Sequence, residues 1–288
     1  MALKHPFMKK DNFHDLTASL EITAKVGESL LVKQLRVGYT WDGSFVEALI
    51  NRLSVGFWYN GGLNENHLEQ CSEATLLPNV FERLIQLGVF KGYPIAEGET
   101  FQLLPAVAGD RVGGVIVYEV HEAGDIKAED DCGSKSKSYM FINYGTNTAE
   151  IAINSYGPLD KSRNPSEYPS FPFGEVVPAG HEIDVLGILL MDWKGYVDDT
   201  AANMRYLRLT KDRKVLFDDD RLGIYSCQGM SYFTWGPNRS TNTDIKLFPV
   251  PITFKAGDEL NVELSAGGVA ITAEDVMIAF ILNVRRVE

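Results

Sequence analysis

Apolar and polar residues alternate along short segments of this chain, and turn-forming residues interrupt the alternation about every ten residues. Alternation with a period of two places the apolar side chains on one face of a β-strand. The clearest predicted strands cover residues 29–39, 51–59, 113–120, 148–155, 182–191, 205–209, 259–264 and 275–287. Helical spacing is found from Leu77 to Leu87, with Pro78 at the first helical position and Gly88 as a stop signal. Many strands with one or two short helices predict an all-β fold, a sandwich or a barrel.

Two patterns next to turns occur twice in the chain. The residues 26–28 (Val-Gly-Glu) precede one long strand, and residues 179–181 (Ala-Gly-His) precede another. The second pattern is a Pro-Ile pair, a Gly-acid turn and a closing strand, at Pro94, Ile95, Gly98, Glu99 and Val120 and again at Pro251, Ile252, Gly257, Asp258 and Val284. The offset between the copies rises from 153 to 164 residues along the chain, as a duplicated β module with loop insertions would show. The alternative is that Gly-acid pairs are common hairpin turns that unrelated strands reuse.

A polar segment at residues 122–138, rich in Gly, Ser, Lys and acidic residues, has the composition of a linker. It divides the chain into two parts. We therefore predict an N-terminal arm at 1–21, a first jelly-roll-like β module at 22–121, and a second jelly-roll-like module with long loops at 139–288.

The charge balance excludes several classes of protein. The chain has 27 Lys and Arg against 39 Asp and Glu, a net charge of −12, and an acidic domain repels phosphates. We therefore expect no direct nucleic-acid binding by the bulk of the chain.

The longest apolar runs, 185–191 and 276–282, are far shorter than the roughly 20 residues of a membrane-spanning helix. The first residues lack the apolar core of a signal peptide, which predicts synthesis in the host cytoplasm.

Motifs for common enzymatic reactions are missing: the sequence has no phosphate-binding loop, no nucleophile elbow and no dinucleotide fingerprint. We therefore expect a protein that is not an enzyme and that needs no cofactor. Asp218, Asp219 and Asp220 could donate oxygens to Ca²⁺ from one turn, although they do not match the spacing of a calcium loop. The alternative for this run is a solvated hairpin tip.

Two loops have compositions that suit contacts. The proline-rich segment 156–173 interleaves its prolines with the aromatic residues Tyr156, Tyr168, Phe171 and Phe173. It should run extended and either reach a neighbouring subunit or wrap its own module. The segment 225–244 places Tyr232, Phe233 and Trp235 among small polar residues. That composition suits a protein contact or stacking on a sugar ring, and the alternative is packing against the end of its own barrel.

The N-terminus differs from the acidic remainder of the chain. Lys4, Lys9 and Lys10 surround Phe7 before the first acidic residue. A short basic and apolar arm predicts an anchor to an acidic partner or an anionic lipid surface, and the alternative is a frayed terminus.

Taken over nearly its whole length, the chain resembles the double jelly-roll major capsid proteins of tailless, often lipid-containing icosahedral viruses and bacteriophages. The resemblance rests on the repeated pattern at residues 94–99 and 251–258, on the helix and on the missing catalytic motifs. It implies two jelly rolls in each subunit, and three subunits in a capsomer that contacts neighbouring capsomers and other virion proteins. It also implies that the two loops form outer or inter-subunit contacts, and that the N-terminal arm faces the inner membrane or the interior of the virion.

Other classes of protein would share these features. A decorating or receptor-binding virion protein would form an isolated trimer with the loop of Tyr232 and Trp235 at its tip. A sugar-binding β-sandwich module would use the same aromatic residues. An enzyme built on a β-barrel would need histidines and carboxylates that converge in the barrel mouth, and their order in the sequence predicts no such cluster.

Overall fold

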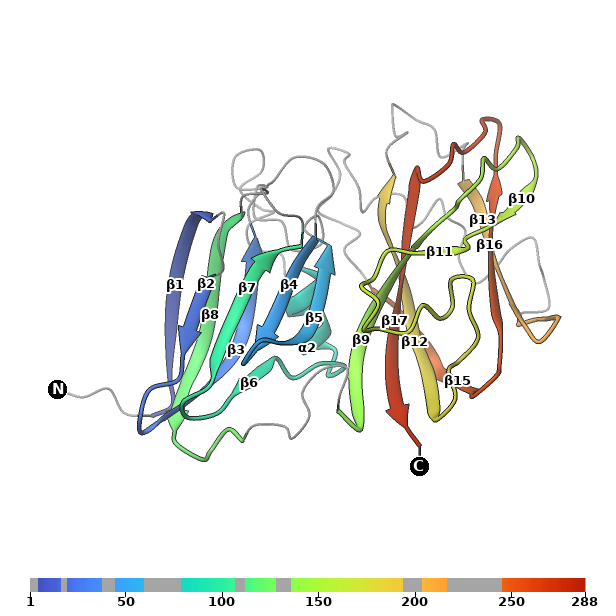
Figure 1. Cartoon of the computed structure of the whole chain (residues 1–288). Helices are drawn as coiled ribbons and strands as arrows, with labels where there is room; N and C mark the ends of the chain where they lie inside the picture. Colours follow the sequence, from blue (N-terminus) through green and yellow to red (C-terminus); the bar gives the residue numbers. More distant parts are fainter. Residues whose placement is uncertain are drawn as a thin grey trace. The chain divides into compact units, whose positions relative to one another are not determined.

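Antiparallel strands make up most of the structure, a computed structural model that describes residues 5–16, 20–37, 45–59, 79–106, 112–127, 136–193, 204–216 and 245–287 (Figure 1). The chain divides into unit 1, Met1–Met140, and unit 2, Phe141–Glu288. The division lies two residues after the predicted end of the linker at residue 138. The predicted all-β sandwich class is confirmed.

Unit 1 contains two four-stranded sheets among its described residues. The first has the order β1-β8-β3-β6, with β1 at Phe7–Leu16, β8 at Val112–Glu122, β3 at Glu28–Val37 and β6 at Tyr93–Ile95. The second has the order β2-β7-β4-β5, with β2 at Leu20–Thr23, β7 at Thr100–Pro105, β4 at Phe45–Ile50 and β5 at Leu53–Tyr59. This order of eight strands in two facing sheets is that of a jelly roll.

Unit 2 repeats the same order of strands. One sheet runs β11-β9-β17-β12-β15, with β11 at Lys161–Ser162, β9 at Ser138–Thr146, β17 at Val276–Arg286, β12 at His181–Trp193 and β15 at Lys246–Lys255. The other runs β10-β16-β13-β14, with β10 at Tyr156–Pro158, β16 at Leu260–Ala266, β13 at Met204–Lys211 and β14 at Lys214–Val215. Apart from the added strand β11, each strand has a counterpart at the same place in unit 1.

The repeated glycines of the sequence occupy equivalent turns of the two jelly rolls. Gly98 donates its N–H to Ala24 at 3.0 Å, and Gly257 donates to Val177 at 2.9 Å. In the same two turns, Glu99 accepts the N–H of Ala96 at 2.8 Å, and Asp258 accepts that of Lys255 at 2.9 Å. Gly98 and Gly257 have φ values of 80° and 86°, which favour glycine. Equal strand order and equal turn hydrogen bonds support duplication of one module over chance reuse of a common turn.

The helix α2 (Val80–Gln86) is shorter than the predicted 77–87, and its first residue is Val80, whereas Pro78 was predicted at that position. Asn79 is the N-cap: its Oδ1 accepts the N–H of Glu82 at 3.0 Å, and its Nδ2 donates to the carbonyl of Leu35 on β3 at 2.7 Å. Gly88, with φ 73°, follows the last turn as predicted. Leu87 lies at helical spacing from the buried Val80 and Leu84, but it is itself 39% exposed, because it follows the last residue of the helix.

The structure corrects one predicted strand and the predicted N-terminal arm. Residues 148–155 form a loop, because the strand of this region is β9, which ends at Thr146. Within that loop, Ile151 makes an isolated bridge to Ile271. The predicted arm at 1–21 contains the strand β1 and the first two residues of β2. Among the described residues, no helix is long and apolar enough to cross a membrane.

Candidate functional site

No group of three or more His, Cys, Asp or Glu that could hold a metal ion occurs in the part of the chain that the structure describes. A β-sandwich makes contacts through its sheet edges and through polar clusters on its surface. An uncovered edge strand presents unpaired N–H and C=O groups to another chain, so proteins cover such edges or protect them.

The N-terminal residues form the edge strand β1, which pairs with β8 from Phe7 opposite Val120 onward. The hydroxyl of the buried Tyr118 donates to Asp11 Oδ2 at 2.6 Å, and burial and this bond together raise the pKa of Tyr118 above its ordinary value. The predicted free arm is thus corrected. A strand that is hydrogen-bonded along its length is part of the sandwich.

The register of β1 also changes the predicted anchor. Phe7 and Lys9 lie opposite the buried residues Val120 and Tyr118, so they point to the inner face of the sheet, whereas Lys10 points to the outer face. An amphipathic membrane anchor requires its basic residues on one face and its apolar residues on the other. The basic and apolar residues of β1 are not separated in this way. Charged side chains that point inward protect an edge strand from pairing with another chain. Lys4 lies outside the described residues.

The aromatic residues of the proline-rich segment belong to the core of unit 2. Tyr168, Phe171 and Phe173 are at most 4% exposed. Phe173 contacts Phe280 edge-on at 5.5 Å between ring centroids. It also lies so close to Gly145 that an added Cβ would come within 2.2 Å of the ring. The prediction that these three side chains contact a neighbouring subunit is corrected, because their own unit buries them.

Tyr156 is the half-buried member of the predicted set. The guanidinium of Arg208 lies over its ring, 4.1 Å from the centroid, and the same side chain bonds Glu263 at 2.6 Å. A cation thus covers one face of this ring. Tyr156 is a packed surface residue and not a bare stacking platform.

Two asparagines hold the proline-rich segment against the edge of β9. Asn164 accepts the N–H of Tyr144 at 2.9 Å and donates to the carbonyl of Ile142 at 2.8 Å, so its side chain replaces a neighbouring strand. The fully buried Asn143 donates to the carbonyl of Phe171 at 2.6 Å and accepts the hydroxyl of Ser162 at 2.8 Å. The segment therefore covers the edge of β9. The counterpart of β9 in unit 1 is β1, whose edge carries the inward-pointing Lys9 instead.

Sequence reasoning missed both asparagines. Asn143 lies in the largely apolar run 139–144, which was not assigned as a strand, and a polar residue within such a run is a usable signal. Nothing in the local pattern identifies the partners, because Asn143 and Phe171 are brought together by the loop that follows β11.

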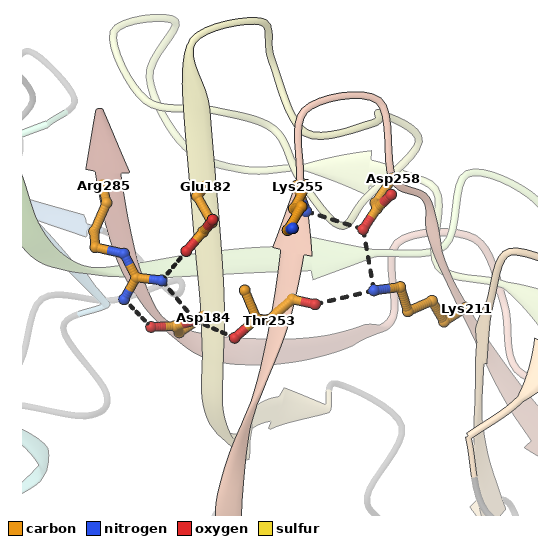
Figure 2. A network of polar contacts seen from close by, with 7 residues as sticks. All are labelled: Glu182, Asp184, Lys211, Thr253, Lys255, Asp258 and Arg285. Atoms are coloured by element: carbon orange, nitrogen blue, oxygen red, sulfur yellow. Dashed lines mark hydrogen bonds and ion pairs between the residues drawn. The ribbon is translucent and has the colours of Figure 1, made fainter. Parts of the chain in front are cut away.

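A polar cluster joins three strands of unit 2 (Figure 2). Arg285 on β17 donates to Glu182 and Asp184 on β12, and these bonds raise the pKa of the guanidinium. Asp184 also accepts the hydroxyl of Thr253 on β15 at 2.7 Å. Glu182 and Arg285 lie opposite each other on β12 and β17. The equivalent pair on β3 and β8 of unit 1 is Ser29 and His121, so this ion pair occurs in unit 2 and not at the matching place in unit 1.

A second part of the cluster links the two sheets of unit 2 (Figure 2). The ammonium of Lys211, at the end of β13, lies 3.0 Å from the carbonyl of Thr253 on β15 and 3.0 Å from Asp258 Oδ2 in the following turn. The N–H of Lys255 and the ammonium of Lys211 lower the pKa of Asp258. Each charged group of the cluster faces an opposite charge, so the arrangement is suited to holding strands together.

The effect of Asp258 on stability should depend on pH. Asp258→Asn is expected to lower the free energy of unfolding at pH 7 by less than about 1 kcal/mol, because the pair is near the surface. A lowered pKa in the folded state means that the difference is present above about pH 4 and disappears as the pH falls further. Urea denaturation from pH 3 to pH 7 measures it. Asp125→Asn, at an exposed turn of unit 1, is the control. If Asp258→Asn lowered the free energy of unfolding by the same amount at every pH, the ionised Asp258 carboxylate would not be the source of the stability.

Several predicted residues lie outside the described part of the chain. They are Lys4, Asp218, Asp219, Asp220, Tyr232, Phe233 and Trp235. The calcium site and the contacts of the second aromatic loop therefore stay predictions.

Comparison with known proteins gives no family for this chain. No family model matches it, and no curated protein matches it. Among solved structures, a peptide-N(4)-(N-acetyl-β-D-glucosaminyl)asparagine amidase aligns over 97% of this chain and 96% of its own, with 8% identity and a TM-score of 0.26. The CUB1-EGF-CUB2 domain of human MASP-1/3 aligns over 96% of this chain and 99% of its own, with 6% identity and a TM-score of 0.22.

A β-porphyranase of glycoside hydrolase family 86 from Bacteroides plebeius aligns over 90% of this chain and 35% of its own. Its identity to this chain is 12%, and the TM-score is 0.22. At TM-scores this low, none of the three alignments carries an argument about function.

Proposed function

We propose that this chain is a structural virion protein, the major capsid protein that trimerises into capsomers and tiles an icosahedral shell. One observation carries the proposal: two jelly rolls with the same order of eight strands follow each other in one chain. This is the arrangement that the resemblance to double jelly-roll capsid proteins implies. The proposal places the protein in the virion, with further copies of itself as its main partners.

The polar features of the described residues support a structural role. Arg285 and Lys211 each join strands of unit 2, and Arg36 of β3 joins the helix α2 through Glu82 in unit 1. Edge strands are covered, as at β9, or carry inward charges, as at β1. Such units pair with other copies only at surfaces that are built for it. The net charge of −12 keeps separate copies soluble until those surfaces meet.

The native mass of the purified protein tests this function. Light scattering over a range of salt and protein concentrations should find a species of three times 32.0 kDa that grows into sheets or closed particles. High salt screens the repulsion between acidic copies and should promote growth. Electron microscopy of the same samples identifies the particles.

Three other outcomes would contradict the capsid assignment. A trimer that never grows would favour a decorating or receptor-binding virion protein. A monomer under all conditions that binds glycans would favour a sugar-binding module. A monomer that binds no glycan would mean that the protein has a function of another class, since proteins with jelly-roll folds serve many functions.

A further inference from the structure

The strand β15 lies at the edge of the five-stranded sheet of unit 2. Among the described residues, its strand partner is β12 on one side, and no strand pairs with its other side. Its counterpart in unit 1, β6, spans three residues, whereas β15 spans ten. A long edge strand is a template for pairing with another chain, and a very short one is not. The edge of β15 therefore needs a protection that β6 does not need.

A bulge with two prolines interrupts β15. The pairing with β12 shifts register there, so residues 248–251 lie opposite Leu186 alone. Pro249 and Pro251 have no N–H to donate to a neighbouring strand. Val250 between them is 73% exposed, because the bulge projects from the sheet. This part of β15 offers no regular row of N–H and C=O groups to another strand.

Beyond the bulge, polar contacts occupy the edge of β15 (Figure 2). The N–H of Lys255 donates to Asp258 Oδ2 at 2.9 Å, and its carbonyl accepts the N–H of Asp258 at 2.8 Å, so the backbone of Lys255 is turned away from β12. Alternate residues of an antiparallel strand turn to the same side, so Thr253 is also turned away from β12. Its carbonyl accepts a hydrogen bond of 3.0 Å from the ammonium of Lys211. The outward carbonyls of both residues are thus already bonded.

We propose that the bulge 248–251 and the Lys211–Asp258 pair prevent β15 from pairing with a strand of another copy of this chain. We call these residues together the β15 guard. The residues at 252–254, Ile-Thr-Phe, favour strand pairing by their side chains. Another copy is the strand donor that this edge meets in a concentrated solution of the protein. Two identical edges are also complementary to each other, because antiparallel strands pair about a two-fold axis.

The first test restores the missing donors. In Pro249→Thr/Pro251→Thr, two N–H groups return to the edge, and threonine favours strand structure. Light scattering at low salt should find association at a protein concentration at least about tenfold lower than the wild type needs. Hydrogen exchange in residues 246–255 should slow on association, because their amides then bond to a second copy. Pro165→Thr/Pro178→Thr, at two half-buried prolines outside the strands of unit 2, is the matched control and should behave like the wild type.

A second variant tests the other half of the β15 guard. Lys211→Met removes the ammonium from the carbonyl of Thr253 and from Asp258, while both prolines stay in place. Association should increase as in the proline variant but by less, because the bulge remains. Lys214→Met removes the same charge at an exposed position of β14 and is its control. Circular dichroism checks the fold of each variant, and Lys211→Met decides if the proline variant does not fold.

Three outcomes would overturn the β15 guard. The first is a folded proline variant that associates no more than the wild type. The second is association that leaves hydrogen exchange in residues 246–255 unchanged. The third is slowed exchange of these residues in assembled wild type, because the edge would then be a contact. The β15 guard does not depend on the capsid assignment: a wild type that stays monomeric would overturn that assignment alone, and the proline variant would still be expected to associate.

Discussion

Replacing Phe173 by alanine is expected to lower the free energy of unfolding by about 3–5 kcal/mol. The ring is 2% exposed, packs edge-on against Phe280, and lies directly on Gly145, which has no side chain to move into the space. Its removal therefore leaves a cavity in the core of unit 2. Chemical denaturation followed by fluorescence and circular dichroism measures the loss.

Tyr156→Ala is the matched control for this prediction, since it removes another aromatic residue of the same proline-rich segment. Its ring is half-buried and contacts Arg208, so the expected loss is about 1 kcal/mol. If Phe173→Ala unfolded like the wild type but failed to assemble, the side chain would be an assembly contact and its burial within unit 2 would be contradicted.

Replacing Glu82 by alanine should destabilise unit 1 by about 3 kcal/mol. The carboxylate is 7% exposed and accepts two hydrogen bonds from Arg36, at 2.7 Å from Nε and 2.9 Å from Nη2. Removing it takes away the anion that faces a partly buried guanidinium and loosens α2 from β3. Thermal and urea unfolding measure the change.

Gln86→Ala on the same helix is the control, because Gln86 is exposed in the last turn and the same alanine replaces it. Its effect should lie within about 0.5 kcal/mol of zero. Equal stability of the two variants would mean that the ion pair contributes nothing and that α2 is held by its apolar residues, such as Phe81, alone.

Local chemistry made some parts of this fold predictable. The alternation in residues 29–39 predicted β3, and the glycines at 27, 98, 180 and 257 predicted turns, because glycine has no Cβ and adopts a positive φ without steric cost. The start of α2 was less predictable. Pro78 and Asn79 are both suited to the beginning of a helix, and the contact of Asn79 with Leu35 on β3 is a tertiary one.

The candidate contacts were harder to assign. The sequence around Phe171 and Phe173 is equally compatible with contact to a neighbouring subunit and with packing on their own sheet. Their side chains are buried because hydrogen bonds of Asn143 and Asn164 hold the segment against β9. The loop at 148–155 alternates like a strand, and its ends are fixed by Asn147 and by a pairing with Ile271 far along the chain.

By itself, the sequence determined the all-β class and the positions of several turns. These depend on residue type and on spacings of a few residues, and short-range sterics and side-chain periodicity act at that range. The tertiary structure decided that one module is repeated, which edges are covered and which aromatic residues are buried. Those properties depend on pairings between residues more than one hundred positions apart, such as Arg285 with Glu182, and no local pattern encodes the partner.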